Sequence, residues 1–257
     1  MKSPVKMISL SLLLTVGIMF TGCKKDEITN NDELEGFYFG ESAQLGQGTV
    51  KTYVQMDVLG APVEMGIMVP EVVMNSLGHD TPAYFSLDLP VKARNVTAYQ
   101  HMLFDWMPHG HEPEGVFTVP HFDLHFYYTS EAERMQIQAT DTVQFMKPVT
   151  EGYIPNQYIN IGGVPEMGSH WINPTDPVFN GAPFTEVFMY GSYDGEVTFI
   201  EPMITKAFIL ENPNFERNML QPGLYPVSGK YYPTVYGVKY VPERKEYRFY
   251  LSGFGEN

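Results

Sequence analysis

The stretch from residue 117 to residue 128, FTVPHFDLHFYY, decides the fold class. Its residue types alternate with a period of two, which places odd-numbered side chains on one face of a β-strand and even-numbered ones on the other. The even-numbered face is mostly apolar and is expected to pack in the core, whereas the odd-numbered face carries His121, Asp123 and His125 in a row. A strand that only supports a core has little reason to carry this row. The stretch therefore predicts both a β-strand and a functional site.

Similar runs of β-branched and aromatic residues, bounded by Gly and Pro, occur on both sides of this stretch. Asp194-Gly195 between two runs is typical of a two-residue hairpin, and short helices are expected only at 70–77 and 131–138. Residues 37–257 are therefore predicted to form a single all-β domain, a β-sandwich or jelly-roll-like barrel with a few short helices. The predicted strands are 49–58, 63–69, 84–89, 95–106, 115–128, 142–146, 184–190, 196–201, 231–240 and 246–251.

The composition excludes several classes of protein. The chain of 257 residues has a formal net charge of -14, so a nucleic acid, whose phosphates it would repel, is not an expected partner. Its single cysteine excludes an internal disulfide and a cysteine-based zinc finger. The 17 Tyr and 17 Phe are too many for a disordered chain and are compatible with a small-molecule or glycan ligand. The sequence leaves a homo-oligomer open.

The N-terminal residues 1–22 read as a cleaved export signal. Two lysines precede an apolar run of 14 residues, MISLSLLLTVGIMF at 7–20, which is shorter than the about 20 residues of a membrane span. The run ends in Phe-Thr-Gly before the only cysteine, Cys23, and this ending resembles the lipobox of bacterial lipoproteins. The resemblance implies cleavage before Cys23 and acylation of that residue, which would anchor the protein in a membrane through palmitate-type acyl chains.

The residues after Cys23 bear on the location of the protein. The sequence KKDE at 24–27 resembles the short export tag of surface lipoproteins in Bacteroidota, and the polar segment 23–36 is predicted to be a tether. The resemblance implies a lipid anchor in the bacterial outer membrane with the domain on the cell surface. A domain on the periplasmic face is the alternative.

The distribution of histidine points to a metal. Five of the seven histidines lie between residues 101 and 125, and His109, His111 and Glu114 belong to a loop rich in Pro and Gly. His170 lies in a second loop, and Glu201 lies in the apolar stretch FIEPMI, where an unpaired carboxylate would be costly. Together with the strand residues, these side chains form a His and carboxylate set suited to divalent Zn, Mn, Fe or Cu.

Strand geometry limits which residues can share one ion. Side chains two apart on a strand are separated by about 6.6 Å, whereas His121 and His125 are separated by about 13 Å. His121 with Asp123, or Asp123 with His125, can therefore chelate one ion, but all three are not expected to do so. The predicted metal ligands are His109, His111, His121, Asp123, His125 and His170.

Two readings of these residues remain open. In an enzyme the metal would polarise a substrate oxygen or generate hydroxide, with Glu114 or Glu201 as the proton acceptor. In the alternative, the protein is a non-catalytic envelope-stress or ligand-binding lipoprotein whose histidines and carboxylates form a structural polar network.

Two family resemblances bear on the fold. His109-x-His111 with Glu114, followed by PEMGSHWIN at 165–173, is similar in residue types to the two cupin motifs, with shifted spacings. It implies a jelly roll that holds a metal through three His and one Glu. A broader resemblance is to an uncharacterised bacterial exported family with a domain of unknown function, one member of which is controlled by an extracytoplasmic-stress sigma factor. It implies an exported β-rich domain and rests on the strings DW at 105–106, PHGHEP at 108–113, PHFDLHFY at 120–127, MGSHW at 167–171, YGS at 190–192 and FIEPM at 199–203.

Overall fold

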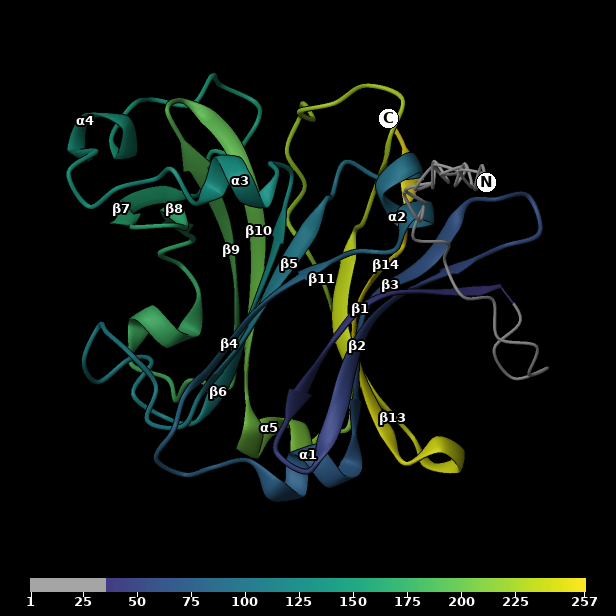
Figure 1. Cartoon of the computed structure of the whole chain (residues 1–257). Helices are drawn as coiled ribbons and strands as arrows, with labels where there is room; N and C mark the ends of the chain where they lie inside the picture. The colour runs from purple at the N-terminus through teal and green to yellow at the C-terminus, as the bar shows by residue number, and fades with distance from the viewer. Residues whose placement is uncertain (1–35) are drawn as a thin grey trace, which may run out of the picture.

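The protein is a β-sandwich of two antiparallel sheets packed face to face (Figure 1). A computed structural model describes residues 36–257, so the predicted signal segment, Cys23 and the tether up to residue 35 lie outside the described residues. One sheet has six strands in the order β1-β2-β3-β14-β13-β11, and the other has seven in the order β4-β5-β6-β10-β9-β8-β7. The arrangement confirms the predicted all-β class with few short helices.

The strands of the six-stranded sheet are β1 (Phe37–Leu45), β2 (Gly48–Met56), β3 (Pro62–Pro70), β14 (Glu246–Ser252), β13 (Val235–Val241) and β11 (Asn214–Asn218). The strands of the seven-stranded sheet are β4 (Ala83–Asp88), β5 (His101–Met107), β6 (His121–Tyr127), β10 (Glu196–Thr205), β9 (Glu186–Tyr193), β8 (Gly168–Ile172) and β7 (Ile159–Val164). β12 (Tyr231–Tyr232) and β15 (Gly255–Glu256) form a two-stranded ribbon.

The helices are short and lie in the connections. They are α1 (Glu71–Ser76), α2 (Val91–Val96), α3 (Glu131–Arg134), α4 (Thr142–Phe145) and α5 (Lys206–Glu211), with 3-10 turns η2 (Pro177–Asn180) and η3 (Pro242–Arg244). No helix among the described residues is long and apolar enough to cross a membrane.

Strand β6 has both faces buried, and this fixes the place of the site. Its even-numbered residues Phe122, Leu124 and Phe126 belong to the main core between the two sheets. Its odd-numbered face looks away from that core toward a second apolar layer, in which Phe117 and Phe184 pack against Met203 of β10. Strands β7 and β8 and helices α3 and α4 lie on this outer side (Figure 1). The row of polar residues in β6 is therefore enclosed rather than exposed.

Two sequence signals of local structure are confirmed. Asp194 and Gly195 have φ angles of 50° and 86° and form the turn of the β9–β10 hairpin. Ser130 and Glu133 form a capping box at the start of α3, although that helix ends at Arg134 instead of residue 138. Both signals depend on neighbours in the sequence, which is why they could be read from it.

The predicted strand at 142–146 is wrong, because these residues form helix α4. The N–H of Phe145 donates to the carbonyl of Asp141 at 2.9 Å, and the Phe145 ring packs inward against Gly163 while Val143 stays exposed. Adjacent β-branched residues produced the strand pattern, and the burial of one aromatic ring overrode it.

Two other predicted strands begin later than expected. The strand predicted from residue 95 starts at His101, because helix α2 follows Pro90 and ends only at Val96. The strand predicted from residue 115 starts at His121, because Gly115 has a φ of 77° and Pro120 has no N–H for a sheet ladder. The predicted strand 231–240 is likewise divided into β12 and β13.

Candidate metal centre

The odd-numbered face of β6 contributes to two separate groups of metal-ligating side chains. The first group, here called the loop triad, is His111, His121 and Asp123, and the second, here called the strand triad, is His125, His170 and Glu201. In each group the ligand atoms lie within 4.8 Å of one another. Both triads therefore consist of two imidazoles and one carboxylate.

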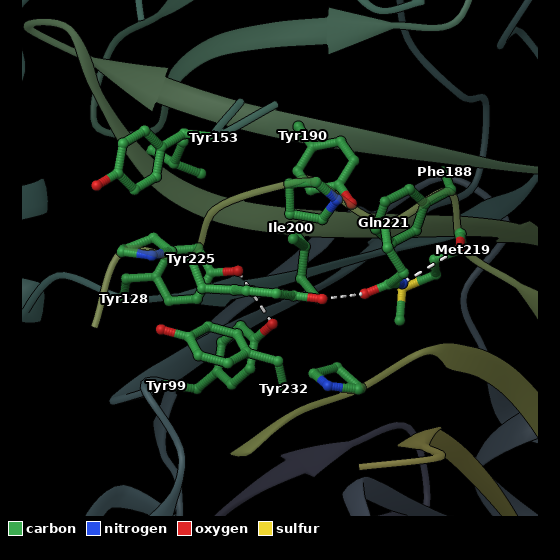
Figure 2. Close-up of a pocket in the computed structure, with 14 residues that line it drawn as sticks. Tyr99, Tyr128, Tyr153, Phe188, Tyr190, Ile200, Met219, Gln221, Tyr225 and Tyr232 are labelled. Carbon is green, nitrogen blue, oxygen red and sulfur yellow. Dashed lines mark hydrogen bonds between the residues drawn. The ribbon is translucent and has the colours of Figure 1, made fainter. Parts of the chain in front are cut away.

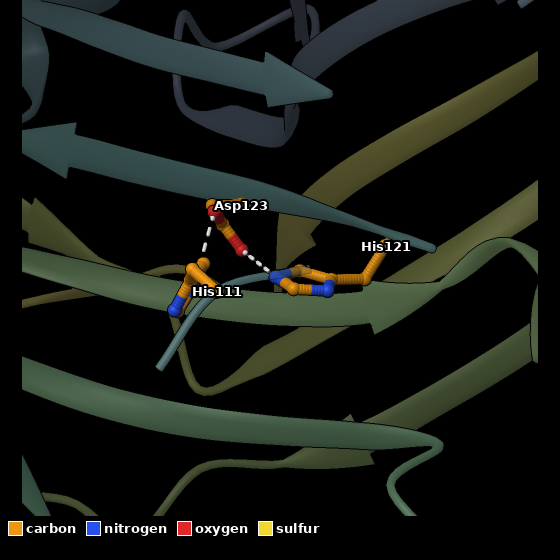
Figure 3. Close-up of side chains that lie close together, drawn as sticks. All are labelled: His111, His121 and Asp123. Carbon is orange, nitrogen blue, oxygen red and sulfur yellow. Dashed lines mark ion pairs between the residues drawn. The ribbon is translucent and has the colours of Figure 1, made fainter. Parts of the chain in front are cut away.

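The loop triad is arranged around the carboxylate of Asp123 (Figure 3). His121 Nε2 lies 2.9 Å from Asp123 Oδ1, and His111 Nε2 lies 3.4 Å from Asp123 Oδ2. His121 and Asp123 come from β6, whereas His111 comes from the loop between β5 and β6. The side chains of His121 and Asp123 are buried and that of His111 is 36% exposed, so His111 is the member that reaches solvent.

Backbone carbonyls fix the tautomer of both imidazoles in the loop triad. His121 Nδ1 lies 2.7 Å from the carbonyl of Val119, and His111 Nδ1 lies 2.6 Å from the carbonyl of Glu112. A carbonyl only accepts, so each Nδ1 donates a proton to it. In the neutral ring Nε2 then carries a lone pair, and both lone pairs are directed toward one carboxylate. Lone pairs and a carboxylate repel one another, so this arrangement is favourable only when a cation or an added proton lies between them.

The pKa values describe a charged loop triad. Burial alone would raise the pKa of Asp123, but its contacts with His111 and His121 outweigh burial and lower that pKa below its usual range. Burial likewise lowers the pKa of His111, but the hydrogen bond and charge of Asp123 outweigh it and raise the pKa overall. The Asp123 carboxylate is thus ionised at neutral pH and ready to bind a cation.

A glycine lets the loop bring His111 to the sheet. Gly110 has a φ of 69°, and a Cβ at this position would overlap the carbonyl of Phe117. The N–H of His111 donates to the same carbonyl at 3.1 Å, which closes the loop against its own return segment. Residue 110 must therefore combine a left-handed conformation with no side chain.

The strand triad assembles from three strands of one sheet. Phe199 pairs with Tyr127 and Met203 with Asp123, so Glu201 of β10 faces His125 of β6. His125 Nε2 lies 3.3 Å from Glu201 Oε1. The third member, His170 of β8, places its Nε2 3.4 Å from Glu201 Oε2. The triad is closed from solvent on the sheet side and is nearly buried throughout.

Strand β9 lies between the strands that carry His170 and Glu201, and its residue at this position has no side chain. Gly191 of β9 pairs with Phe199 on one side and with His170 on the other. A Cβ on Gly191 would overlap the ring of Phe199, whose centroid lies 5.1 Å from that of His125 and 5.1 Å from that of His170. The absence of a side chain at Gly191 thus gives Phe199 room to pack against both imidazoles.

The strand triad is neutral where the loop triad is charged. Burial, together with the charges of Asp123 and Asp105, raises the pKa of Glu201 well above its usual value. Burial lowers the pKa of His170 to about 4, and burial with the charge of His170 lowers that of His125 to about 3. A protonated carboxyl between two uncharged imidazoles is therefore the stable metal-free form.

Buried polar atoms without a hydrogen-bond partner concentrate on this face of the sheet. His125 has neither Nδ1 nor Nε2 satisfied among the described residues, and the others on this face are His121 Nε2, Asp123 Oδ1, Glu201 Oε2, Asp105 Oδ1 and His101 Nδ1. A buried polar group without a partner is costly, and a cluster of such groups needs an explanation. A cation at each triad would supply the missing partner for the ligand atoms.

Asp105 is a site residue that the sequence did not single out. It lies on β5 directly opposite Asp123 and is buried, and burial with the charge of Asp123 raises its pKa well above the usual value. The only signal in the sequence is an acidic residue inside an otherwise apolar strand, HMLFDWM at 101–107. On the same strand, His101 accepts a hydrogen bond from Arg134 at 3.2 Å and stacks on Tyr127, which gives it a structural role.

Two of the expected site residues belong to neither triad. His109 has a 70% exposed side chain and lies 3.7 Å from Asp80, and Glu114 is exposed. The structure also separates Asp123 and His125, which fall in different triads, and it separates His111 from His170. The residues of the cupin-like motifs are therefore not collected around one point. Glu201, expected as a proton acceptor, instead forms part of a triad.

The structure also contains a small aromatic pocket, shown in Figure 2. Its volume is about 10 Å³, the space of one water molecule. The Tyr99 and Tyr128 hydroxyls lie 3.1 Å apart, and Tyr225 donates to Gln221 at 2.9 Å, so the polar groups of the lining satisfy one another. As it stands, this pocket offers no room for a glycan or another small molecule.

No protein-family model, curated protein or solved structure matches this chain.

Proposed function

We propose that this protein is an exported bacterial lipoprotein whose β-sandwich binds a divalent transition-metal ion, with the loop triad as the primary site. The observation that carries the proposal is the orientation of His111 and His121, which both donate Nδ1–H to a backbone carbonyl and direct Nε2 at one ionised carboxylate. Metal-binding histidines in proteins usually have their second nitrogen held in this way.

The donor set narrows the choice of metal. Two imidazoles and one carboxylate suit Zn, Fe(II) and Mn(II), and Cu(II) also accepts such ligands. Three protein ligands leave at least one coordination position for water or substrate, and His111 brings this side of the site to solvent. A bound metal would supply Lewis-acid chemistry at that open position.

The role of this chain's own residues follows from their surroundings. Val119 and Glu112 orient the imidazoles through their carbonyls. The ring of Phe184 packs against His121 and that of Phe117 packs against His111. Asp105, opposite Asp123, is placed to accept or release a proton beside the site. Glu114 is exposed and is not part of this proposal.

The strand triad is proposed as a second, weaker site. Glu201 must lose its proton before it can bind a metal, whereas the Asp123 carboxylate of the loop triad is already ionised. His125 also has no carbonyl or carboxylate on its second nitrogen to orient it. The two sites should consequently fill in order, the loop triad first.

A metal-binding assay with a matched control tests the proposal. Residues 24–257 are stripped with a chelator and titrated with Zn²⁺, Mn²⁺ and Fe²⁺, with bound metal and melting temperature measured for each. The His121→Ala variant should lose the tightest site, whereas His109→Ala, which removes an exposed histidine outside both triads, should retain it. If the unmodified protein binds no stoichiometric metal, the histidines form the polar network of the alternative reading and the metal proposal is wrong.

The proposed lipid anchor has its own test. A Cys23→Ser variant should lose incorporation of a labelled fatty acid and should no longer fractionate with membranes. Protease added to intact cells should remove the domain if it faces outward; protection from the protease would place it on the periplasmic face.

A further inference from the structure

The two most exposed large apolar side chains among the described residues are neighbours in one turn. Val58 is 100% exposed and Leu59 is 90% exposed, and both lie in the turn between β2 and β3. The next most exposed residue of this kind, Val143, is 76% exposed and has no such neighbour. Residues 57–61 are here called the hairpin tip. Single exposed apolar residues are ordinary, whereas an adjacent pair at this exposure is a candidate contact surface.

The hairpin tip is held in one conformation. The Asp57 carboxylate accepts hydrogen bonds from the N–H groups of Leu59 at 2.9 Å and Ala61 at 2.8 Å. The N–H of Gly60 donates to the Asp57 carbonyl at 3.1 Å, and Gly60 has a φ of 84°, which suits glycine. The fold therefore displays Val58 and Leu59 on a rigid support, so little conformational entropy is lost when they bind.

The chain enters the domain beside the hairpin tip. The carbonyl of Gly36, the first described residue, accepts a hydrogen bond from the N–H of Met56 at 2.9 Å. Cys23 precedes Gly36 by 36 − 23 = 13 residues, which span at most about 45 Å at about 3.5 Å per residue. An acyl group on Cys23 would thus keep Gly36, and with it the strand end beside the hairpin tip, within about 45 Å of the bilayer.

We infer that the hairpin tip is a membrane-contacting surface, in which Val58 and Leu59 enter the interface of the bilayer that holds the acylated Cys23. This inference rests on the proposed lipid anchor. The partner is a lipid interface, because the tip presents aliphatic side chains and the chain carries a net charge of -14, which gives no general attraction to anionic headgroups. Zwitterionic lipid is accordingly the expected surface.

The contact would orient the metal sites away from the membrane. In Figure 1 the turn between β2 and β3 projects at the right, whereas β7 and β8, which flank the outer face of the seven-stranded sheet, lie at the left. The triads lie on that outer face. A domain held by both its tether and its hairpin tip would present the triads to the surrounding medium.

Site-specific fluorescence on the full-length lipoprotein tests this inference. Val58→Cys and, as the control, Val143→Cys are each labelled with an environment-sensitive fluorophore, since acylation blocks the only native thiol. The proteins are reconstituted into phosphatidylcholine vesicles, with or without a nitroxide-labelled lipid. The label at residue 58 should shift to shorter wavelength and be quenched at least about twofold more by the lipid nitroxide than the label at residue 143, since only the first is expected at the interface.

Three outcomes would overturn the inference, and they are distinguishable. Equal quenching at the two positions in protein that floats with the vesicles refutes the hairpin contact and leaves the lipid anchor intact. Protection of residue 58 from a water-soluble quencher without quenching by the lipid nitroxide means that a second copy of the chain covers the tip. Failure of both variants to float with vesicles refutes the anchor together with the inference.

Discussion

The two triads contain the same residue types, two histidines and one carboxylate, yet they differ in charge. In the loop triad Asp123 has a lowered pKa and His111 a raised one, so the group favours charged side chains. In the strand triad Glu201 has a raised pKa and both histidines have lowered ones, so the metal-free group is neutral. The difference arises from surroundings and not from composition.

Hydrogen bonding to the second ring nitrogen separates the two environments. The loop triad has carbonyls that fix both imidazoles, and its half-buried His111 leaves one side near water. The strand triad lies deeper, and His125 has no hydrogen-bond partner on either nitrogen among the described residues. A list of ligand types is therefore insufficient to rank candidate metal sites, because orientation and the cost of charging the ligands decide the affinity.

The largest expected effect is the loss of metal affinity on removing the shared carboxylate of the loop triad. Asp123→Asn should weaken the tightest metal site by more than about 100-fold, since it removes a direct ligand and its charge, whereas changes around ligands alone cost about 10–100-fold. Calorimetric titration with Zn²⁺ measures this. Glu114→Gln, which neutralises an exposed carboxylate outside the triads, is the control and should bind as the unmodified protein does. Equal affinity of the two variants would place the tight site elsewhere.

The second prediction concerns the opposite charge state of the strand triad. Because the pKa of Glu201 is raised in the folded protein, its protonated form stabilises the fold below about pH 4.5, and this contribution is lost as pH rises toward the folded pKa. Glu201→Gln mimics the protonated form, so the metal-free variant should exceed the unmodified protein in stability by about 1.4 kcal/mol for each pH unit crossed in that window. Urea unfolding at pH 4, 6 and 8 measures this.

The same variant distinguishes stability from binding. Without metal at pH 8, Glu201→Gln should be more stable than the unmodified protein. Added metal should not stabilise this variant through the strand triad. A variant that is less stable than the unmodified protein at pH 8 would show that Glu201 is ionised in the fold, contrary to the neutral triad described above.

The third prediction concerns acid. The pKa of His170 is lowered to about 4, so its neutral form stabilises the fold above about pH 6.5, and this contribution is lost as pH falls from 6.5 toward 4. In this pH window His170 takes up a proton when the protein unfolds, and the His170→Gln variant cannot do so. Its free energy of unfolding should change with pH less steeply than that of the unmodified protein, by about 1.4 kcal/mol per pH unit in this window. A slope for His170→Gln equal to that of the unmodified protein would contradict the lowered pKa of His170.

The smallest expected effects come from the two glycines that support the triads separately. Gly110→Ala should cost about 1–2 kcal/mol of stability from its left-handed backbone, and it should weaken binding at the loop triad through a displaced His111. Gly191→Ala should displace Phe199 and cost about 1–3 kcal/mol by overpacking, with an effect on the strand triad alone. Metal titrations of both variants measure these effects, with Gly255→Ala as the control because a Cβ there meets no other atom. If either substitution weakened metal binding at both triads, the two sites would not be separate.

Much of the fold could be predicted from the sequence because its signals are local. Alternation in β6 identified the face that carries His121, Asp123 and His125, and strand spacing predicted that the first and last of these cannot share an ion. Helix α4 was missed because the burial of Phe145, a contact made across the fold, outweighed the local preference for a strand.

The composition of each triad could not be predicted, because it depends on contacts far apart in the chain. His109 and His111 are equivalent in the sequence, and only the backbone turn at Gly110 brings the second to Asp123. Glu201 and His170 meet because the sheet order places β10 and β8 on either side of β9. A non-local strand order of this kind has no signature in the residues themselves.

Anomalous X-ray diffraction at the zinc absorption edge, on crystals of the protein equilibrated with a low concentration of Zn²⁺, would show whether the loop triad binds a metal ion. We expect an anomalous peak at about 2.0–2.2 Å from His111 Nε2, His121 Nε2 and a carboxylate oxygen of Asp123, and we expect it at a lower Zn²⁺ concentration than any peak at the strand triad. An empty loop triad under these conditions, or a peak at the strand triad alone, would contradict this expectation.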